Sequence, residues 1–398
     1  MTGLLKRTVR RLLPALLWFL RLCTPTINSV VVAAFPATEA NAVETVRALL
    51  QHYRGKVVWL DGPSIEWLSA EGPIQSDVHK LRVLPKASIR GIGYYLCSSA
   101  VFVTHGIYGL PRVVRRKPTI YLGHGEAIKR CVPLFPSRLA GGKPVDFIVG
   151  NTRRFAPLYN SVGAELLLSG YPRNDAIRRP ASDAMLERLS IDPTAPFVLW
   201  MPSFRQSKRV SLDGGYIDTT DVSKDEDLAT MFERGASELT KRGIQLVIKP
   251  HPIDAVARGV SGATVIDDNI LNGSRVGLYE LMGRAAGLIT DASSVGIDFL
   301  LLDRPIAYFF PDLEEYSQRR GLWPEDVLDH LPGPFLVGPE DFKEFARQVL
   351  GESSRHDAQR EQSVKWVGVL KPQSCAVEML RLLRRATVDS ILARGLEI

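Results

Sequence analysis

The residues best suited to chemistry follow short apolar segments of this chain. Gly123-His124-Gly125 comes after residues 119–122, and the two glycines leave the imidazole unobstructed and let a ligand approach the backbone. An imidazole has an unperturbed pKa of about 6.5, so its neutral form accepts a hydroxyl proton near physiological pH. His124 is therefore predicted to be a general base; the alternative is an incidental residue in a tight turn.

A second segment, residues 288–298, has the pattern of a phosphate site. Its apolar run ends in Thr290 and Asp291, and Ser293 and Ser294 follow ahead of an apolar helix. Free backbone N–H groups, the helix dipole and the serine hydroxyls would converge on an anion there. The alternative is that Asp291 or Ser293 only caps the helix, and this segment alone does not decide between the two.

Basic side chains follow two further apolar segments in the second half of the chain. Lys249 and His251 alternate with prolines just past a predicted strand, so the pair would neutralise or hydrogen-bond a diphosphate. Arg205 closes the segment Pro202-Ser-Phe-Arg205, and a guanidinium binds phosphate oxygens bidentately. The alternatives are a structural histidine and a surface arginine.

The elements that must position these residues alternate between short β-branched runs and helical stretches. That alternation is typical of βα units in a mostly parallel sheet. It predicts two doubly wound, Rossmann-like domains facing a cleft, with ligands beyond the carboxyl ends of the strands. The expected strands lie at 30–34, 57–60, 101–104, 119–122, 147–149, 166–168, 197–200, 246–249, 264–266, 288–290 and 306–309.

The domain boundaries follow from breaks in this pattern. Prolines and turn-forming residues interrupt it near 172–195, where a hinge is predicted between domains at 26–175 and 176–372. Residues 208–224 lack periodicity and are predicted to form a mobile loop. Helices are expected at 339–350 and 374–394, and the segment 373–398 is predicted to pack across the two lobes.

The basic charge of the chain is concentrated in residues 1–25. Five basic residues (Lys6, Arg7, Arg10, Arg11 and Arg21) precede the first acidic one, and the other residues carry only +2 of the net +7. The apolar run between them is far shorter than the ~20 residues of a spanning helix. It predicts a helix lying on an anionic membrane surface with Trp18 and Phe19 inserted, or else an ordinary terminal helix. No nucleic-acid-binding motif is present.

The four cysteines are widely scattered and form no pair or cluster at metal-ligand spacing. A reduced, metal-free cytoplasmic protein is therefore predicted, with its cysteines as small buried hydrophobic residues.

Taken in order, the segments resemble the CDP-glycerol glycerophosphotransferase family of teichoic acid and capsule synthesis. The His-Gly motif is matched by Gly123-His-Gly125, and the Gly-x-Pro-Arg-x-Asp element by Ser169-Gly-Tyr-Pro-Arg-Asn-Asp175. The remaining matches are Pro202-Ser-Phe-Arg205, Lys249-Pro-His-Pro252, Ile289-Thr-Asp-Ala-Ser-Ser294, and Asp303-Arg-Pro-Ile306 leading to Asp312-Leu-Glu-Glu-Tyr316. Ala292 stands where the family commonly has tyrosine.

The resemblance implies a GT-B architecture in which the second domain holds a CDP-polyol and the first meets the acceptor. It implies catalytic roles for His124 and His251, with the diphosphate held by residues of the second domain. Those donor-binding candidates are Arg205, Lys249, Thr290, Asp291, Ser293 and Ser294, and further candidates are Gly125, Arg173 and Asp298.

The implied reaction is attack of an acceptor hydroxyl on the phosphorus that bears the polyol, with CMP leaving. No cofactor is required, because positioning and charge neutralisation drive phosphoryl transfer, although Mg²⁺ is not excluded. The implied donor is CDP-glycerol or CDP-ribitol, and the acceptor a lipid-linked or polymeric glycan at the cytoplasmic face of the bacterial membrane. The alternatives are a GT-B nucleotide-sugar glycosyltransferase or epimerase, and a catalytically idle membrane-associated binding module.

Overall fold

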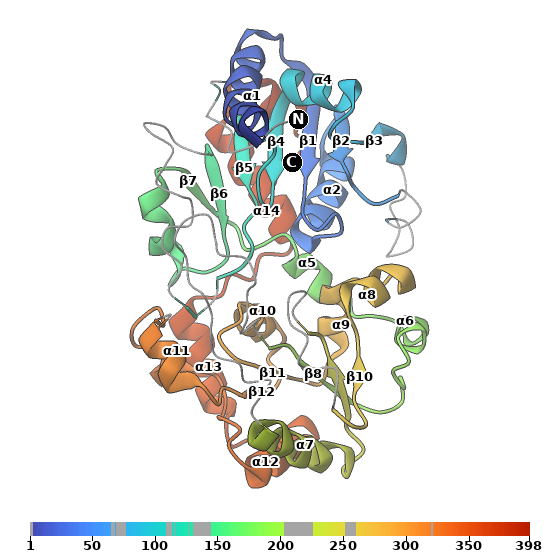
Figure 1. The fold of residues 1–398 in the computed structure, drawn as a ribbon, viewed down its shortest axis with the longest axis vertical. Coiled ribbons are helices and arrows are strands. Elements are labelled where there is room, and N and C mark those ends of the chain that lie inside the picture. The colour runs from blue at the N-terminus through green and yellow to red at the C-terminus, as the bar shows by residue number, and fades with distance from the viewer. Residues whose placement is uncertain are drawn as a thin grey trace. The chain divides into compact units, whose positions relative to one another are not determined.

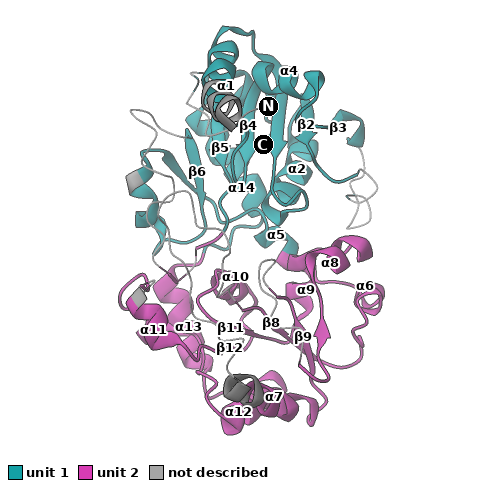
Figure 2. Ribbon diagram, in the orientation of Figure 1, with its two compact units in different colours: residues 1–124, 132–176, 370–398 teal, residues 125–131, 177–369 magenta. Residues whose placement is uncertain are grey.

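The computed structural model describes residues 3–64, 68, 77–108, 114, 116–126, 128–129, 145–202, 226–250, 260–319 and 321–398. Two compact units make up the chain (Figure 2). Unit 1 contains residues 1–124, 132–176 and 370–398, and unit 2 contains residues 125–131 and 177–369.

Unit 1 is built on a seven-stranded parallel sheet of order β3-β2-β1-β4-β5-β6-β7. The strand order reverses between β1 and β4, which is the mark of a doubly wound sheet. The strands are β1 Ile27–Ala33, β2 Lys56–Leu60, β3 Leu81–Leu84, β4 Ser98–Val103, β5 Thr119–Tyr121, β6 Phe147–Gly150 and β7 Glu165–Leu168.

Helices cover both faces of this sheet because successive strand residues point to opposite sides. Val30 and Val32 pack beneath α2 (Ala40–His52) and α14 (Cys375–Ala386). Val31 and Ala33 face α1 (Gly3–Cys23) and α4 (Ile89–Cys97), which lie side by side (Figure 1). The other elements of this unit are η1 Val78–Lys80, η2 Ala156–Val162, α5 Asn174–Ile177, which reaches one residue past the unit boundary, and α15 Ile391–Gly395.

Asp175 ties the C-terminal helix α14 to unit 1. Its carboxylate accepts hydrogen bonds from the Ser374 hydroxyl at 2.6 Å and from the backbone N–H groups of Cys375 at 2.7 Å and Ala376 at 3.0 Å. These donors belong to the first turn of α14, where a negative charge also meets the positive end of the helix dipole. The last residue of the Gly-x-Pro-Arg-x-Asp element is therefore a cap for a helix 200 residues further along the chain.

Replacing this cap is expected to loosen α14. Asp175→Ala leaves the Cys375 and Ala376 donors without their carboxylate and should lower the free energy of unfolding by roughly 1–3 kcal/mol. Chemical denaturation measures the loss, and hydrogen exchange should quicken at the first amides of α14. Asp389→Ala, which removes an exposed carboxylate of the same unit, is the control. Equal protection of α14 in both variants would contradict the capping role.

Unit 2 contains a five-stranded parallel sheet of order β10-β9-β8-β11-β12. Its strands are β8 Phe197–Trp200, β9 Gln245–Ile248, β10 Thr264–Val265, β11 Gly287–Thr290 and β12 Ile306–Tyr308. Phe232 of α7 (Glu226–Thr240) and Phe342 of α12 (Pro339–Val349) pack on one face of this sheet. The unit also holds α6 Asp183–Arg188, α8 Asp268–Ser274, α9 Leu278–Arg284, α10 Val295–Phe299, η5 Leu300–Leu302, α11 Leu313–Arg319, η6 Val327–His330 and α13 Asp357–Val367.

All eleven strands predicted from the sequence are present, and β3 is an addition. The helix expected at 339–350 is α12. The one expected at 374–394 is interrupted at residues 387–390 and forms α14 and α15. The segment 373–398, predicted to pack across the lobes, lies within unit 1. The loop predicted at 208–224 falls outside the described residues.

Helix α1 is fastened to unit 1 by its last turn. The Arg21 guanidinium, only 2% exposed, donates to the carbonyls of Tyr95 at 2.7 Å and Lys117 at 3.2 Å. Lys117 in turn donates its ammonium to the carbonyls of Arg21 and Thr24 at 2.8 Å each. The expectation that Arg21 meets an anionic surface is therefore wrong, because its charge serves packing within the domain. Within the described residues, no helix is long and apolar enough to cross a membrane.

Candidate functional site

Polar side chains gather beyond the carboxyl ends of the strands in unit 1, around the point where the strand order reverses. Glu39 follows β1, His105 follows β4, His124 follows β5, and Arg173 follows β7. Open α/β sheets bind ligands in this region, because the loops there diverge and leave a crevice. The predicted base and three residues around it thus share one edge of the sheet.

The His124 loop is held by hydrogen bonds to two successive carbonyls. Asn41 donates its side-chain amide to the Gly123 carbonyl at 3.3 Å, and Arg173 donates to the His124 carbonyl at 2.8 Å. The two donors are themselves joined, because the Arg173 backbone N–H donates to Asn41 Oδ1 at 3.1 Å. We call Asn41 and Arg173 the loop clamp. Arg173, a candidate site residue from the sequence, is 4% exposed and acts here through the backbone of His124.

Gly123 is required by this geometry for two reasons. Its φ of +78° lies in the left-handed region that glycine adopts freely. A side chain at this position would also meet the ring of Tyr171, which approaches to 2.5 Å from where a Cβ would stand. The Arg173 guanidinium also lies over the Tyr171 ring, 4.7 Å from its centre. Gly125, the second glycine of the motif, has a φ of +127°.

The imidazole of His124 is exposed and lies among aromatic rings. The ring of His105 is 3.8 Å away, centre to centre, and that of Tyr121 is 5.5 Å away. Desolvation lowers the pKa of His124 below its usual value, and the positive charges of His105 and Arg173 lower it further. Water at the open side of the ring limits the size of this fall. The ring is therefore neutral near physiological pH, as a general base requires.

Glu39 supports the loop clamp from the start of α2. Its carboxylate accepts from the Asn41 amide at 3.1 Å and from the Ala42 backbone N–H at 3.1 Å, where it caps the helix. Burial raises the pKa of Glu39 to about 7, although the nearby Arg173 charge opposes this. This carboxyl therefore exchanges its proton near neutral pH while bonded to a residue that holds the His124 loop.

In unit 2, the predicted phosphate residues lie at the carboxyl end of β11, where the strand order of that sheet reverses. The Thr290 hydroxyl donates to the Met201 carbonyl at 2.9 Å and so links the ends of β11 and β8. Asp291 is buried and accepts from the Ser293 backbone N–H at 3.2 Å. Ser293 and Ser294 are half-buried, and Ser294 precedes α10 without capping it through its side chain.

Two other candidates in unit 2 have their charges engaged. Lys249 is 5% exposed, and its ammonium lies 2.9 Å from the Asp268 carboxylate and 3.2 Å from the Pro250 carbonyl. Asp298 is 1% exposed and accepts from the Tyr279 hydroxyl at 2.7 Å. Asp298 thus joins α10 to α9. If Lys249 bound a diphosphate, its ammonium would have to leave the Asp268 carboxylate or contact both groups at once.

Two predicted site residues, Arg205 and His251, lie outside the described residues. No group of three His, Cys, Asp or Glu side chains at metal-ligand distance occurs among the residues that the structure places. That no cofactor is required, with Mg²⁺ not excluded, stays a prediction to be tested in solution.

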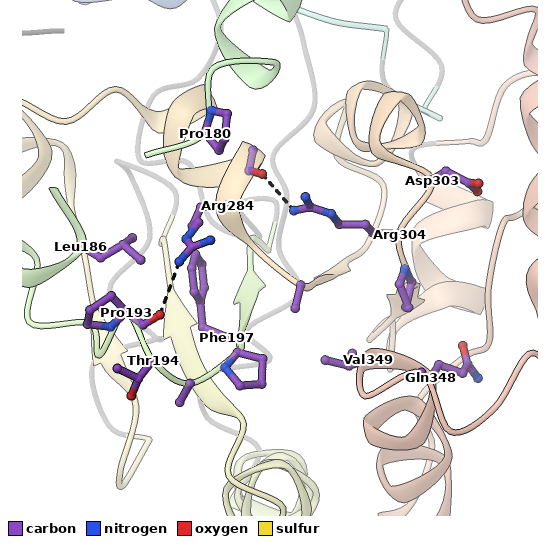
Figure 3. Close-up of a pocket in the computed structure, with 16 residues that line it drawn as sticks. Pro180, Leu186, Pro193, Thr194, Phe197, Arg284, Asp303, Arg304, Gln348 and Val349 are labelled. Carbon is purple, nitrogen blue, oxygen red and sulfur yellow. Dashed lines mark hydrogen bonds between the residues drawn. The ribbon is translucent and has the colours of Figure 1, made fainter. Parts of the chain in front are cut away.

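A pocket of about 530 Å³ lies at the opposite edge of the unit 2 sheet (Figure 3). Its lining includes Phe197, Ala286 and Pro305, which stand at or just before the starts of three strands. The guanidinium of Arg304 donates to the carbonyls of Gly283 at 2.9 Å and Ala285 at 2.6 Å, at the end of α9. This arginine serves as a helix C-terminal cap, and the pocket contains none of the predicted site residues.

Comparison with known proteins decides the family. A sequence model of the CDP-glycerol:poly(glycerophosphate) glycerophosphotransferases matches residues 147–367, which is more than half of the chain. The chain belongs to this family. The matched region contains the whole sheet of unit 2, and the resemblance inferred from the sequence motifs is confirmed.

Curated members of the glycerophosphotransferase family match part of the chain. A teichoic acid glycerol-phosphate primase of Bacillus subtilis (strain 168) is 27% identical over 169 residues, 42% of this chain and 39% of that protein. A teichoic acid glycerol-phosphate transferase of Staphylococcus aureus (strain NCTC 8325 / PS 47) is 26% identical over 198 residues, 46% of this chain and 45% of that protein. The chain therefore spans less than half the length of these two relatives.

A solved structure of the wall teichoic acid polymerase TagF shares the fold. Its TM-score is 0.69 at 17% identity, and the match covers 97% of this chain and 96% of that one. The predicted fold class, an α/β architecture of GT-B type with two Rossmann-like domains, is confirmed by this likeness and by the two parallel sheets.

Three residues of this candidate site were missed from the sequence: Glu39, Asn41 and His105. A signal for His105 exists, because Thr104-His105-Gly106 follows a buried strand in the same way as Gly123-His124-Gly125. Glu39 and Asn41 have no such signal. Their role depends on the pairing of β1 with β4 and of β4 with β5, which brings segments 82 residues apart into contact.

Proposed function

We propose that this protein transfers glycerol phosphate, or another polyol phosphate, from a CDP-polyol to a hydroxyl of a lipid-linked or polymeric glycan and releases CMP. The observation that carries the proposal is an accessible, neutral imidazole, His124, at the carboxyl edge of a Rossmann-like sheet in a chain of the glycerophosphotransferase family. The product would belong to teichoic acid or a capsule-like polymer of the cell surface.

The proposed reaction gives each unit a task of its own. In unit 1, His124 accepts the proton of the acceptor hydroxyl as its oxygen attacks the phosphorus that bears the polyol. The bond between that phosphorus and the CMP oxygen breaks, and CMP leaves with its electron pair. In unit 2, the hydroxyls of Ser293 and Ser294 and the backbone after β11 are available to the diphosphate. Neutralising and orienting the phosphates supplies most of the catalysis in such transfers.

The direct experiment follows CMP release from purified protein, a lipid-linked disaccharide and CDP-glycerol, with CDP-ribitol in a parallel reaction. Release that depends on the acceptor supports the transferase, and mass spectrometry of the product identifies the polyol. No CMP from any CDP-polyol would refute it. Tighter calorimetric binding of a UDP-sugar than of CDP-polyols would favour a nucleotide-sugar enzyme instead. EDTA added to the same assay reveals any dependence on Mg²⁺.

We also propose that α1 attaches the protein peripherally to the cytoplasmic face of the membrane. Leu13, Leu16 and Leu20 recur at helical spacing, and Phe19 lies beside them; these four side chains are 37–55% exposed. Trp18 is half-buried, so Phe19 is the better candidate for insertion. Lys6, Arg7, Arg10 and Arg11 occupy the preceding turns of the helix, and each cation near an anionic leaflet adds about 1 kcal/mol.

Charged substitutions on this exposed apolar face are expected to detach the protein. Leu16→Glu with Phe19→Glu removes two inserting side chains and adds two negative charges, so binding to anionic vesicles should weaken at least roughly tenfold. Vesicle sedimentation measures this while Arg21 keeps α1 on the domain. Val388→Glu, which alters an exposed apolar residue of the same unit, is the control. Binding that survives the double substitution would exclude α1 as the attachment.

A further inference from the structure

Two histidine rings lie in contact at the carboxyl edge of the unit 1 sheet. His105 follows β4 and His124 follows β5, which are adjacent parallel strands. Their ring centres are 3.8 Å apart and the ring planes are inclined by 47°. Aromatic rings meet the pair on both sides, Phe35 edge-on to His105 at 5.6 Å and Tyr121 edge-on to His124 at 5.5 Å. The pair is thus held in a fixed arrangement next to the loop clamp.

The charged groups around this pair are mostly positive. Those that act on His124 are His105 and Arg173. The Glu39 carboxylate is bonded to Asn41 and to the start of α2, and it interacts with Arg173. Among the described residues, no carboxylate forms an ion pair with either imidazole. Within the part of the chain that the structure describes, neither imidazole therefore has an ion-pair partner for a second proton.

We propose that His105 is a positioning residue for His124. The His105 ring holds the His124 ring by contact and, once His105 is protonated, its charge opposes protonation of His124. This deepens the proposed function, on which it rests. Two imidazoles this close titrate as one coupled unit, because a second proton must be added beside the first. The Arg173 charge acts against a proton on His124, whereas burial alone lowers the pKa of His105, so His105 takes the first proton. His124 then stays neutral to a lower pH than a lone histidine in its place.

The arrangement separates two contributions of the same side chain. The flat ring restricts the orientation of His124 through contact, which any aromatic ring of similar size provides. The charge acts only when His105 is protonated, which phenylalanine never is. Burial lowers the pKa of His105 itself, so this effect operates at mildly acidic pH and not at alkaline pH. Substitutions that keep or remove the ring therefore distinguish the two contributions.

The test is an NMR titration of the histidine rings in the full chain without substrate. His105→Phe keeps an aromatic ring in contact with His124 and removes the charge. It should raise the apparent pKa of His124 by about one pH unit. The His124 resonance is assigned by its loss in His124→Gln. His330→Phe is the matched control, since His330 stacks on Trp366 at 4.3 Å in unit 2. An unchanged His124 titration in His105→Phe would overturn the electrostatic part of the proposal.

Enzymatic activity tests whether contact with the His105 ring positions His124. The acidic limb of kcat/KM for CMP release should move upward in His105→Phe by the same amount as the His124 titration. His105→Ala also removes the ring, and at alkaline pH its kcat should be roughly tenfold below that of His105→Phe. Equal kcat values in the two variants at alkaline pH would overturn the positioning of His124 by contact with the His105 ring. If the wild-type protein released no CMP from any CDP-polyol, the proposed function would fail while the titration still decided the histidine pair.

Discussion

His124→Gln protein is expected to release CMP from CDP-glycerol about 10²–10⁴-fold more slowly than the wild type, because a positioned general base contributes that much to a proton transfer. Glutamine keeps a polar side chain of similar size at an exposed position, so the fold should not change. The Gly123 and His124 carbonyls remain available to the loop clamp, which bonds to the backbone only. The measurement is kcat at saturating donor and acceptor.

The pH profile distinguishes the base from other roles for this histidine. Because its pKa is lowered, His124 is unprotonated across neutral pH, and kcat/KM should fall only as acid protonates the ring. The residual activity of His124→Gln should lack that limb. His330→Gln is the matched control, an exchange of the same residue types in unit 2. Turnover close to wild type in a folded His124→Gln protein would remove His124 from the mechanism.

Arg173→Lys is expected to lower kcat by roughly 10–100-fold with little change in KM. Lysine keeps the positive charge but lacks the planar group that donates to the His124 carbonyl and lies over the Tyr171 ring. The His124 loop would shift by a fraction of an ångström to an ångström, and displacements of that size cost up to about 10²-fold in rate. Steady-state kinetics for the donor and the acceptor separate the two constants.

A direct ligand role for Arg173 would produce a different result. If the guanidinium bound a substrate phosphate, its replacement would raise KM for that substrate more than it lowered kcat. Arg188→Lys, an exchange on the exposed side of α6, controls for a general effect of the substitution. Asn41→Ala removes the other half of the loop clamp and should act in the same direction as Arg173→Lys. A rise in KM alone would contradict the positioning role.

Much of the fold was predictable because apolar periodicity is a local property of the sequence. Each predicted strand is a short, mostly apolar run, and many of these runs are rich in β-branched residues, as in residues 30–33 of β1. Residues 81–84 of β3 form no such uninterrupted run, since Arg82 breaks it and only Leu81 is buried, so pairing with β2 is what makes this segment a strand. The break between α14 and α15 was likewise hidden, because a mixed polar and apolar pattern continues through it.

The candidate site was predictable where a motif carries its own chemistry. His124 between two glycines, and Ser293 and Ser294 after a buried strand, combine a reactive side chain with a backbone that exposes it. Arg21 shows the opposite case. In the sequence it continues a basic segment, and only the carbonyls of Tyr95 and Lys117 reveal that it is buried. Asp175 is similar, because its partners in α14 lie 200 residues away.

The sequence by itself determined the family, the two parallel sheets and the choice of His124 as a candidate base between two glycines, since these depend on residue types and their spacing along the chain. Tertiary structure decided what surrounds His124. Asn41, at the start of α2, and Arg173 and His105, on two loops, reach it because the strand order of unit 1 places these three segments at one edge of the sheet. Which side chains meet there depends on the pairing of strand residues 18–71 positions apart in the sequence, and no local pattern records that pairing.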